Sequence, residues 1–141
     1  MRLWHKDLIS VLPDKQLLGQ WRECCAIASN IANKGTPNHI LVNKIMDYPI
    51  GHFYIYGVLV YTEMKHRRFK CEFAKFAALI NDSTNPPFWV PQTEDVFNDW
   101  HNRRYLMQCI YNLQEKYDCG GIKDEEWSQL IKYFESVGIY L

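Results

Sequence analysis

Apolar residues return at helical spacing in a stretch close to the amino terminus. They follow one another in steps of four, three, four and three, which is the pattern of one buried stripe along an α-helix. The residues of this stripe are Leu17, Trp21, Cys24, Ala28 and Ile31. Asp14 precedes the stripe as an N-cap, and Lys34-Gly35 ends it. The stretch therefore predicts a long helix that packs one face against a core.

The rest of the chain divides into further helices by the same reasoning. Caps, glycines, prolines and apolar periodicity predict helices over 39–46, 50–68, 73–80, 93–117 and from 124 to just before 138. For Tyr54–Tyr61 a strand is the competing prediction, and Asn81–Pro87 is predicted to be a loop. The buried side of the helix over 93–117 is expected to carry Trp100, Met107, Ile110 and Tyr111. We expect an all-α fold, a single domain of four to six helices over 1–141.

Composition limits the class of protein. With 48% hydrophobic residues and 15% aromatic residues in 141, the chain can bury a core and is not a disordered segment. It has neither an apolar run near the length of a membrane span nor the pattern of a signal peptide, so we expect a cytosolic protein with no membrane partner. The five cysteines are unevenly spaced, which favours buried free thiols over disulfides or a zinc site. We expect no metal and no cofactor.

The charge is zero overall but unevenly distributed. Residues 1–70 carry ten Lys/Arg against five Asp/Glu, a balance of +5, whereas residues 71–141 carry six against eleven, a balance of −5. Two interpretations stay open: the basic half contacts phosphates, or the two halves attract each other across the fold.

The residues with the most specific chemistry lie in the first 23 positions. The chain begins Met-Arg-Leu-Trp, continues through Leu12-Pro13-Asp14, and reaches Trp21-Arg22-Glu23 on the predicted helix. At about 100° per residue, Glu23 points about 120° away from the centre of the apolar stripe. From the helix alone, Arg22 and Glu23 would be a solvated pair on an exposed face.

Together these three segments resemble the start of the pyrimidine-dimer DNA glycosylase family, of the phage endonuclease V type and its bacterial relatives. The resemblance is strongest over residues 1–33 and weaker to about residue 70. It implies a DNA repair enzyme that acts on double-stranded DNA with damaged bases. In this family the chain's own α-amino group is the nucleophile, so that Met1 and Glu23 would be catalytic, and Arg2, Arg22 and His39 would bind DNA.

The implied chemistry suits these residue types. An amine must be uncharged to attack the sugar, and an α-amino group with an ordinary pKa of about 8 is partly neutral at neutral pH. Because Arg2 is large, the initiator methionine is expected to stay, with the amine on Met1. The attack would displace the base and form a Schiff base, and Glu23 would then move protons during strand cleavage. Trp4 is either a packing anchor or a surface on which a displaced base stacks.

Some residues depart from the phage pattern. Ala26 stands where the phage enzyme has an arginine, and the carboxy-terminal end is neither basic nor aromatic in the phage manner. Lesion recognition is therefore less firmly implied than amine chemistry. The alternative function is a non-catalytic helical module that keeps the fold and binds nucleic acid or a protein.

Overall fold

The structure is a computed structural model that describes residues 1–83 and 88–141. It confirms an all-α fold in one compact domain, and the described residues contain no strand. In order, the elements are the 3-10 helix η1 (Lys6–Val11), α1 (Asp14–Lys34), the 3-10 helix η2 (Asn43–Asp47), α2 (Gly51–His66), α3 (Phe73–Ser83), the 3-10 helix η3 (Thr93–Asp95), α4 (Arg103–Asp118) and α5 (Asp124–Ser136). The strand considered for Tyr54–Tyr61 is wrong, since this segment lies within α2.

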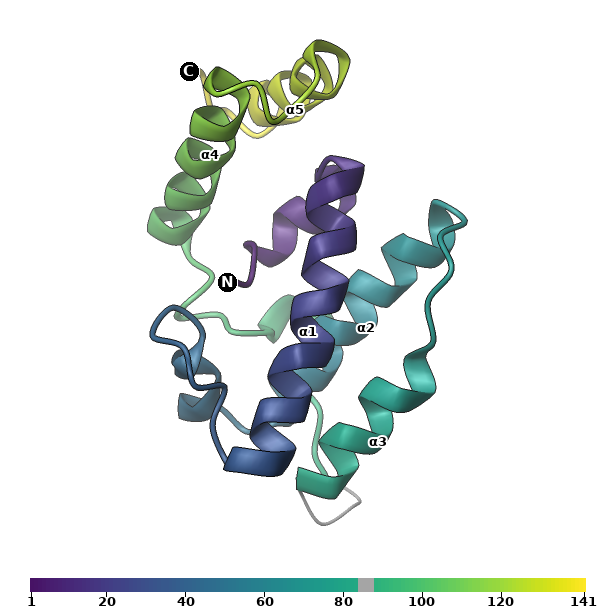
Figure 1. Ribbon diagram of the computed structural model, residues 1–141. Coiled ribbons are helices and arrows are strands. Elements are labelled where there is room, and N and C mark those ends of the chain that lie inside the picture. The colour runs from purple at the N-terminus through teal and green to yellow at the C-terminus, as the bar shows by residue number, and fades with distance from the viewer. Residues whose placement is uncertain (84–87) are drawn as a thin grey trace.

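Helices α1, α2 and α3 form a bundle in the lower part of the molecule (Figure 1). All five residues of the predicted apolar stripe of α1 are buried in it. Trp21 of the stripe packs against Phe76 of α3, with 5.7 Å between the ring centroids. The close approach of α2 and α3 depends on Gly57, because a Cβ atom there would lie 2.3 Å from the Phe76 ring. This packing explains a glycine inside a long helix.

The start of α1 differs from the prediction. Asp14 was expected to cap the helix, but Pro13 is the N-cap residue and makes no side-chain cap, and Asp14 is the first helical residue. The Asp14 carboxylate pairs instead with Arg67, just after α2, at 3.0 Å. A charged partner from a distant segment therefore engages the oxygen that a cap would have used.

The region before α4 is the largest error in the prediction. A single helix over 93–117 was expected, but only η3 and α4 are helical, and α4 begins at Arg103 with the Asn102 side chain accepting the Tyr105 N–H. The buried Phe97 has a φ of 51°, which a continuing α-helix does not permit. Trp100 is buried ahead of α4, whereas Tyr111, expected to be buried, is 54% exposed.

Smaller differences concern the connections. The helix predicted over 39–46 is a turn followed by η2, and the one over 73–80 continues to Ser83. The loop predicted over 81–87 is thus helical at its start, and residues 84–87 lie outside the described residues. The helix from Asp124 is confirmed as α5, which buries Leu130 and Phe134.

Helices α4 and α5 form the upper part of the molecule, and the amino terminus lies below α4, beside α1 (Figure 1). α5 packs against η1. All cysteines are free, but only Cys24 and Cys109 are buried. The ion pairs found in the described ranges all lie within residues 1–70, so none of them joins the basic half to the acidic half.

Candidate active site

Residues Met1–His5, which we call the N-terminal arm, are held to α1 by Gln20 and Glu23. The Glu23 carboxylate accepts the backbone N–H of Arg2 at 3.3 Å. The Gln20 amide donates to the Arg2 carbonyl at 2.9 Å and accepts the Trp4 N–H at 2.6 Å. Because the arm offers both a donor and an acceptor to Gln20, only one orientation of the amide satisfies both bonds. One glutamine therefore fixes the register between the arm and α1.

Two tyrosines from other helices complete the attachment of the arm. Tyr56 of α2 donates to the Trp4 carbonyl at 2.6 Å, and its hydroxyl also lies 2.9 Å from the Gln20 carbonyl oxygen. Tyr105 of α4 donates to the Leu3 carbonyl. Burial raises the pKa of both tyrosines above the ordinary value, which keeps them protonated hydrogen-bond donors. The arm is thus bonded to three helices at once.

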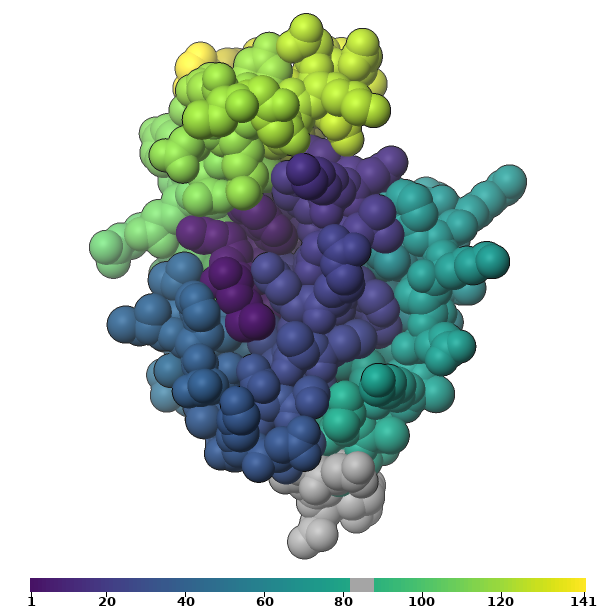
Figure 2. All heavy atoms as spheres, viewed as in Figure 1, coloured from purple at the N-terminus to yellow at the C-terminus, as the bar shows by residue number. Residues whose placement is uncertain are grey.

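A cavity of about 240 Å³, the site cavity, opens beside the arm. Its lining consists of Met1, Arg2, Trp4, Glu23, Leu41, Asn112 and Lys116. Figure 2 shows the first residues, in dark purple, at the surface between the blue segment that follows α1 and the green α4. Met1 is 39% exposed and Glu23 is half-buried. The chain's first residue and the carboxylate of α1 therefore share one opening.

Two cations face one carboxylate in the site cavity. The Arg2 guanidinium lies 5.5 Å from the centre of the Trp4 ring, within range of a cation–π contact. It also lies 4.0 Å from the thiol of Cys109. Lys116 of α4 adds the second positive charge. Burial raises the pKa of Cys109, so this thiol is neutral and unsuited to act as a nucleophile beside the cavity.

The structure brings together some of the residues that the sequence indicated. Met1, Arg2 and Glu23 line the site cavity together with Trp4, which is 6% exposed and serves as a packing anchor. Arg22 does not line the cavity and is exposed on α1.

His39 also lies outside the cavity lining. It is half-buried in the turn before η2, where its Nδ1 accepts the Leu41 N–H at 3.2 Å. His39 is therefore hydrogen-bonded to Leu41, which lines the site cavity.

Sequence reasoning missed Gln20, Tyr56 and Tyr105 as positioning residues. Gln20 precedes Glu23 by three residues, so helical spacing puts both on one side of α1, and this spacing was the available signal. It also missed Asn112 and Lys116. These two are four residues apart and so share a face of α4, but nothing local relates that face to α1.

A histidine pair anchors the far end of the arm. The His5 Nε2–H donates to the His101 carbonyl at 2.8 Å, and His101 Nδ1 accepts the Lys6 N–H at 2.9 Å. Burial, with smaller effects of His5 and Lys6, lowers the pKa of His101 to about 2. Both rings are therefore neutral at neutral pH, and they act as a hydrogen-bonded anchor for the arm.

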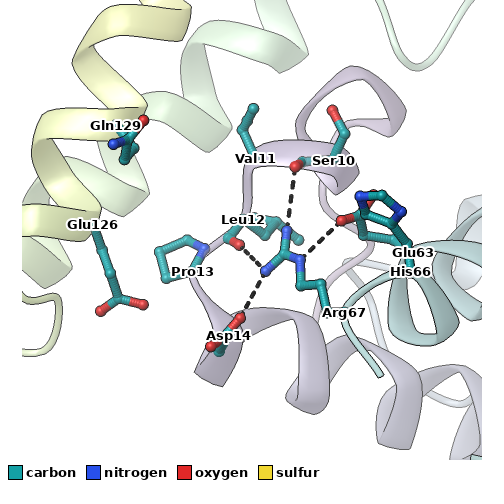
Figure 3. A pocket seen from close by; sticks show the side chains of 10 residues that line it. All are labelled: Ser10, Val11, Leu12, Pro13, Asp14, Glu63, His66, Arg67, Glu126 and Gln129. Atoms are coloured by element: carbon teal, nitrogen blue, oxygen red, sulfur yellow. Dashed lines mark hydrogen bonds and ion pairs between the residues drawn. The ribbon is translucent and has the colours of Figure 1, made fainter. Parts of the chain in front are cut away.

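A larger cavity, of about 450 Å³, lies between η1, the end of α2 and α5 (Figure 3). Its arginine, Arg67, is already used: it donates to the carbonyls of Ser10 and Leu12 and to the carboxylates of Asp14 and Glu63. The other charged side chains around it are mainly acidic. Arg67 therefore joins the end of α2 to the start of α1. The acidic lining makes this cavity unsuited to a polyanion.

The described residues lack two further features. They hold no group of three or more side chains placed to bind a metal ion. They also contain no helix with the length and hydropathy of a membrane span.

Comparison with known proteins gave one match. Residues 1–75 match the model of a family described as pyrimidine dimer DNA glycosylase. No curated protein and no solved structure matches the chain. The matched segment contains the arm, α1 and α2, and it ends within α3.

Proposed function

The chain belongs to the pyrimidine dimer DNA glycosylase family, which gives it a function of that general type, and on this premise we propose that it also cleaves DNA at the resulting abasic site through a Schiff base on the Met1 amine. One observation carries the proposal: Met1 and Glu23 line a single accessible cavity together with a cation, Arg2. The match covers more than half of the chain and includes all three of these residues.

The proposed reaction has two stages. The neutral Met1 amine attacks C1′ of the deoxyribose, the bond to the damaged base breaks, and the base leaves with the bonding electrons and takes up a proton. The sugar ring opens to an imine between C1′ and the Met1 nitrogen. Loss of a C2′ proton then expels the 3′ phosphate, and water releases the amine. Glu23 receives and returns the protons, and its charge stabilises the cationic imine.

The surroundings of Glu23 support this role. Its Oε2 accepts hydrogen bonds from the Arg2 N–H and from the Gln20 amide, each at 3.3 Å. Both bonds end on the same oxygen, so Oε1 has no hydrogen-bond partner among the residues that the structure describes. The carboxylate is thus held in place by one oxygen while the other is available for proton transfer.

The cations around the site suit the phosphates next to the lesion. Arg2 and Lys116 line the site cavity, and both can contact the strand that enters it. Arg22 is exposed one position before Glu23, and His39 lies two residues before Leu41. We propose that these two contact DNA outside the cavity, where they position the duplex.

Borohydride trapping tests the amine chemistry directly. The protein is incubated with duplex DNA that contains an abasic site, and the reduced adduct is digested and mapped. We expect a covalent link on the peptide that begins at Met1. No adduct at any value between about pH 6 and pH 9 would remove the proposal and favour a non-catalytic binding module.

Glu23→Gln separates proton transfer from DNA binding. The variant keeps the size of the side chain, so we expect DNA binding to change little while strand cleavage falls at least about a hundredfold. Glu72→Gln makes the same change at an exposed site outside the cavity and is expected to cleave normally. Equal cleavage by both variants would assign Glu23 a structural role only.

Blocking the amine provides a second test. A short extension that places residues before Met1 moves the amine out of the cavity, so we expect loss of the adduct. An extended chain that still forms it would show that another amine is the nucleophile.

A further inference from the structure

Two apolar side chains project beside the site cavity. Ile40 is 86% exposed and Leu41 is 51% exposed, whereas the next residue, Val42, is fully buried. Leu41 lines both the site cavity and a neighbouring cavity of about 270 Å³. Adjacent apolar side chains held at the edge of a site are typical of a binding surface, whereas single ones elsewhere are ordinary.

The turn that carries Ile40 is internally bonded. The His39 carbonyl accepts the N–H groups of Val42 at 3.0 Å and Asn43 at 2.8 Å, and the Asn43 side chain accepts the His39 N–H at 2.9 Å. Asn38, ahead of it, has a φ of 61°, which turns the chain sharply. Ile40 is therefore held outward by an ordered turn, so that its use in binding costs little conformational entropy.

The charges around the two cavities are mostly positive. The site cavity has Arg2 and Lys116 against Glu23. The neighbouring cavity has Lys44 and Arg104 against Asp99. Four cations thus accompany two carboxylates on a chain whose formal charge is zero. Such a surface complements the phosphate backbone of duplex DNA next to the projecting side chains.

We propose that Ile40 is a wedge that enters the base stack of duplex DNA next to the damaged bases. A sugar inside a stacked duplex is poorly accessible to an amine at the edge of a cavity, and apolar side chains inserted between base steps unstack and bend the helix. Ile40 has the required chemistry, exposure and position, one residue from a side chain that lines the site cavity. The inference rests on the proposed function for its substrate.

Fluorescence of 2-aminopurine tests the wedge. The probe is placed opposite a stable abasic-site analogue in a duplex, where unstacking raises its emission. We expect the native chain to raise the emission and Ile40→Ser to raise it much less, at matched DNA occupancy measured by anisotropy. Met46→Ser is the control, because Met46 is 47% exposed in η2 but lines neither cavity. Its response should equal that of the native chain.

Cleavage supplies the second measurement. The Ile40→Ser variant should excise the damaged base from a fully paired duplex at least about tenfold more slowly than the native chain. This defect should largely disappear on a duplex in which mismatches already disrupt the base stack beside the lesion. An equal defect on both substrates would make Ile40 a docking contact and overturn the wedge.

The remaining outcomes are also decisive. Equal emission with Ile40→Ser and the native chain overturns the proposal, and so does no response from the native chain, which would favour a protein partner for this surface. Unstacking by a native chain that forms no borohydride adduct would support the wedge while rejecting the proposed amine chemistry.

Discussion

The segment matched by the family model and the carboxy-terminal segment use polar side chains in different ways. Three polar side chains are buried in residues 1–75, those of His5, Gln20 and His52. Gln20 binds the main chain of the arm, and His5, which belongs to the arm, binds the main chain of His101. In α4 and α5 every buried residue is apolar. His101, just before α4, is the one buried polar side chain that the later segment provides among the described residues.

This difference teaches how the site is specified. An apolar stripe determines that a helix packs, but many partners satisfy it equally well. A buried amide with a donor on one side and an acceptor on the other accepts only one placement of its neighbour. The earlier segment therefore fixes the geometry of the site, and α4 adds Asn112 and Lys116 to the lining of the cavity.

The largest expected effect is at Gln20. Gln20→Met leaves the buried Trp4 N–H and the Arg2 carbonyl without this partner, so we expect the free energy of unfolding to fall by about 3–5 kcal/mol. A displaced arm should also lower strand cleavage at least about a hundredfold. Urea unfolding measures the loss of stability, and single-turnover kinetics measure the loss of strand cleavage. Gln114→Met, at a half-buried position of α4, should change stability by less than about 0.5 kcal/mol, and equal losses would contradict the comparison.

Gly57 tests how tightly the bundle is packed. Gly57→Ala places a methyl group 2.3 Å from the Phe76 ring, and we expect a loss of about 1–3 kcal/mol although alanine favours helix. Gly19→Ala in α1 is the matched control, since a Cβ atom there meets nothing within 4 Å. It should raise stability by up to about 1 kcal/mol. Melting curves that moved in the same direction for both variants would refute the packing argument.

His101 should make stability sensitive to acid. Because its pKa is about 2 when folded and about 6.5 when unfolded, protons bind preferentially to the unfolded chain between these values. The contribution of neutral His101 to the free energy of unfolding is fully present above about pH 6.5. About 2 kcal/mol of this contribution is lost by about pH 5. Burial lowers the pKa of His5 and His52 as well, so they act in the same direction.

The variant His101→Asn isolates this effect. Its side-chain oxygen can still accept the Lys6 N–H, but it does not titrate. Unfolding in urea at several pH values should show a shallower decline below about pH 6.5 than in the native chain. An unchanged decline would assign the acid sensitivity to other groups.

The smallest effect is expected where α4 meets the arm. Tyr105→Phe removes the hydrogen bond to the Leu3 carbonyl and should cost about 1 kcal/mol. Tyr111→Phe, on the exposed face of α4, is expected to change stability by less than about 0.5 kcal/mol. Chemical denaturation can resolve the two. A loss at Tyr105 as large as that at Gln20 would mean that both segments specify the site equally.

Much of the fold was predictable because its signals are local. The stripe on α1, the end of that helix at Gly35 and the start of α5 all follow from periodicity and stop signals within a few residues. The prediction failed at the start of α1, where a distant group intervened, and in the segment before α4. Arg67 engages the carboxylate of Asp14, and the buried Phe97 adopts a positive φ that interrupts the helix expected over 93–117.

The sequence by itself determined that α1 is amphipathic and that Glu23 lies off its apolar stripe, since one helix's geometry sets both. It also carried the resemblance on which the nucleophile and the acid were predicted. Only the tertiary structure decided that Gln20 is buried, that Tyr105 reaches the arm, and that Leu41 and Lys116 complete a cavity around Met1 and Glu23. These contacts join residues far apart in the chain, and no local pattern of hydrophobicity records which of the possible partners will meet.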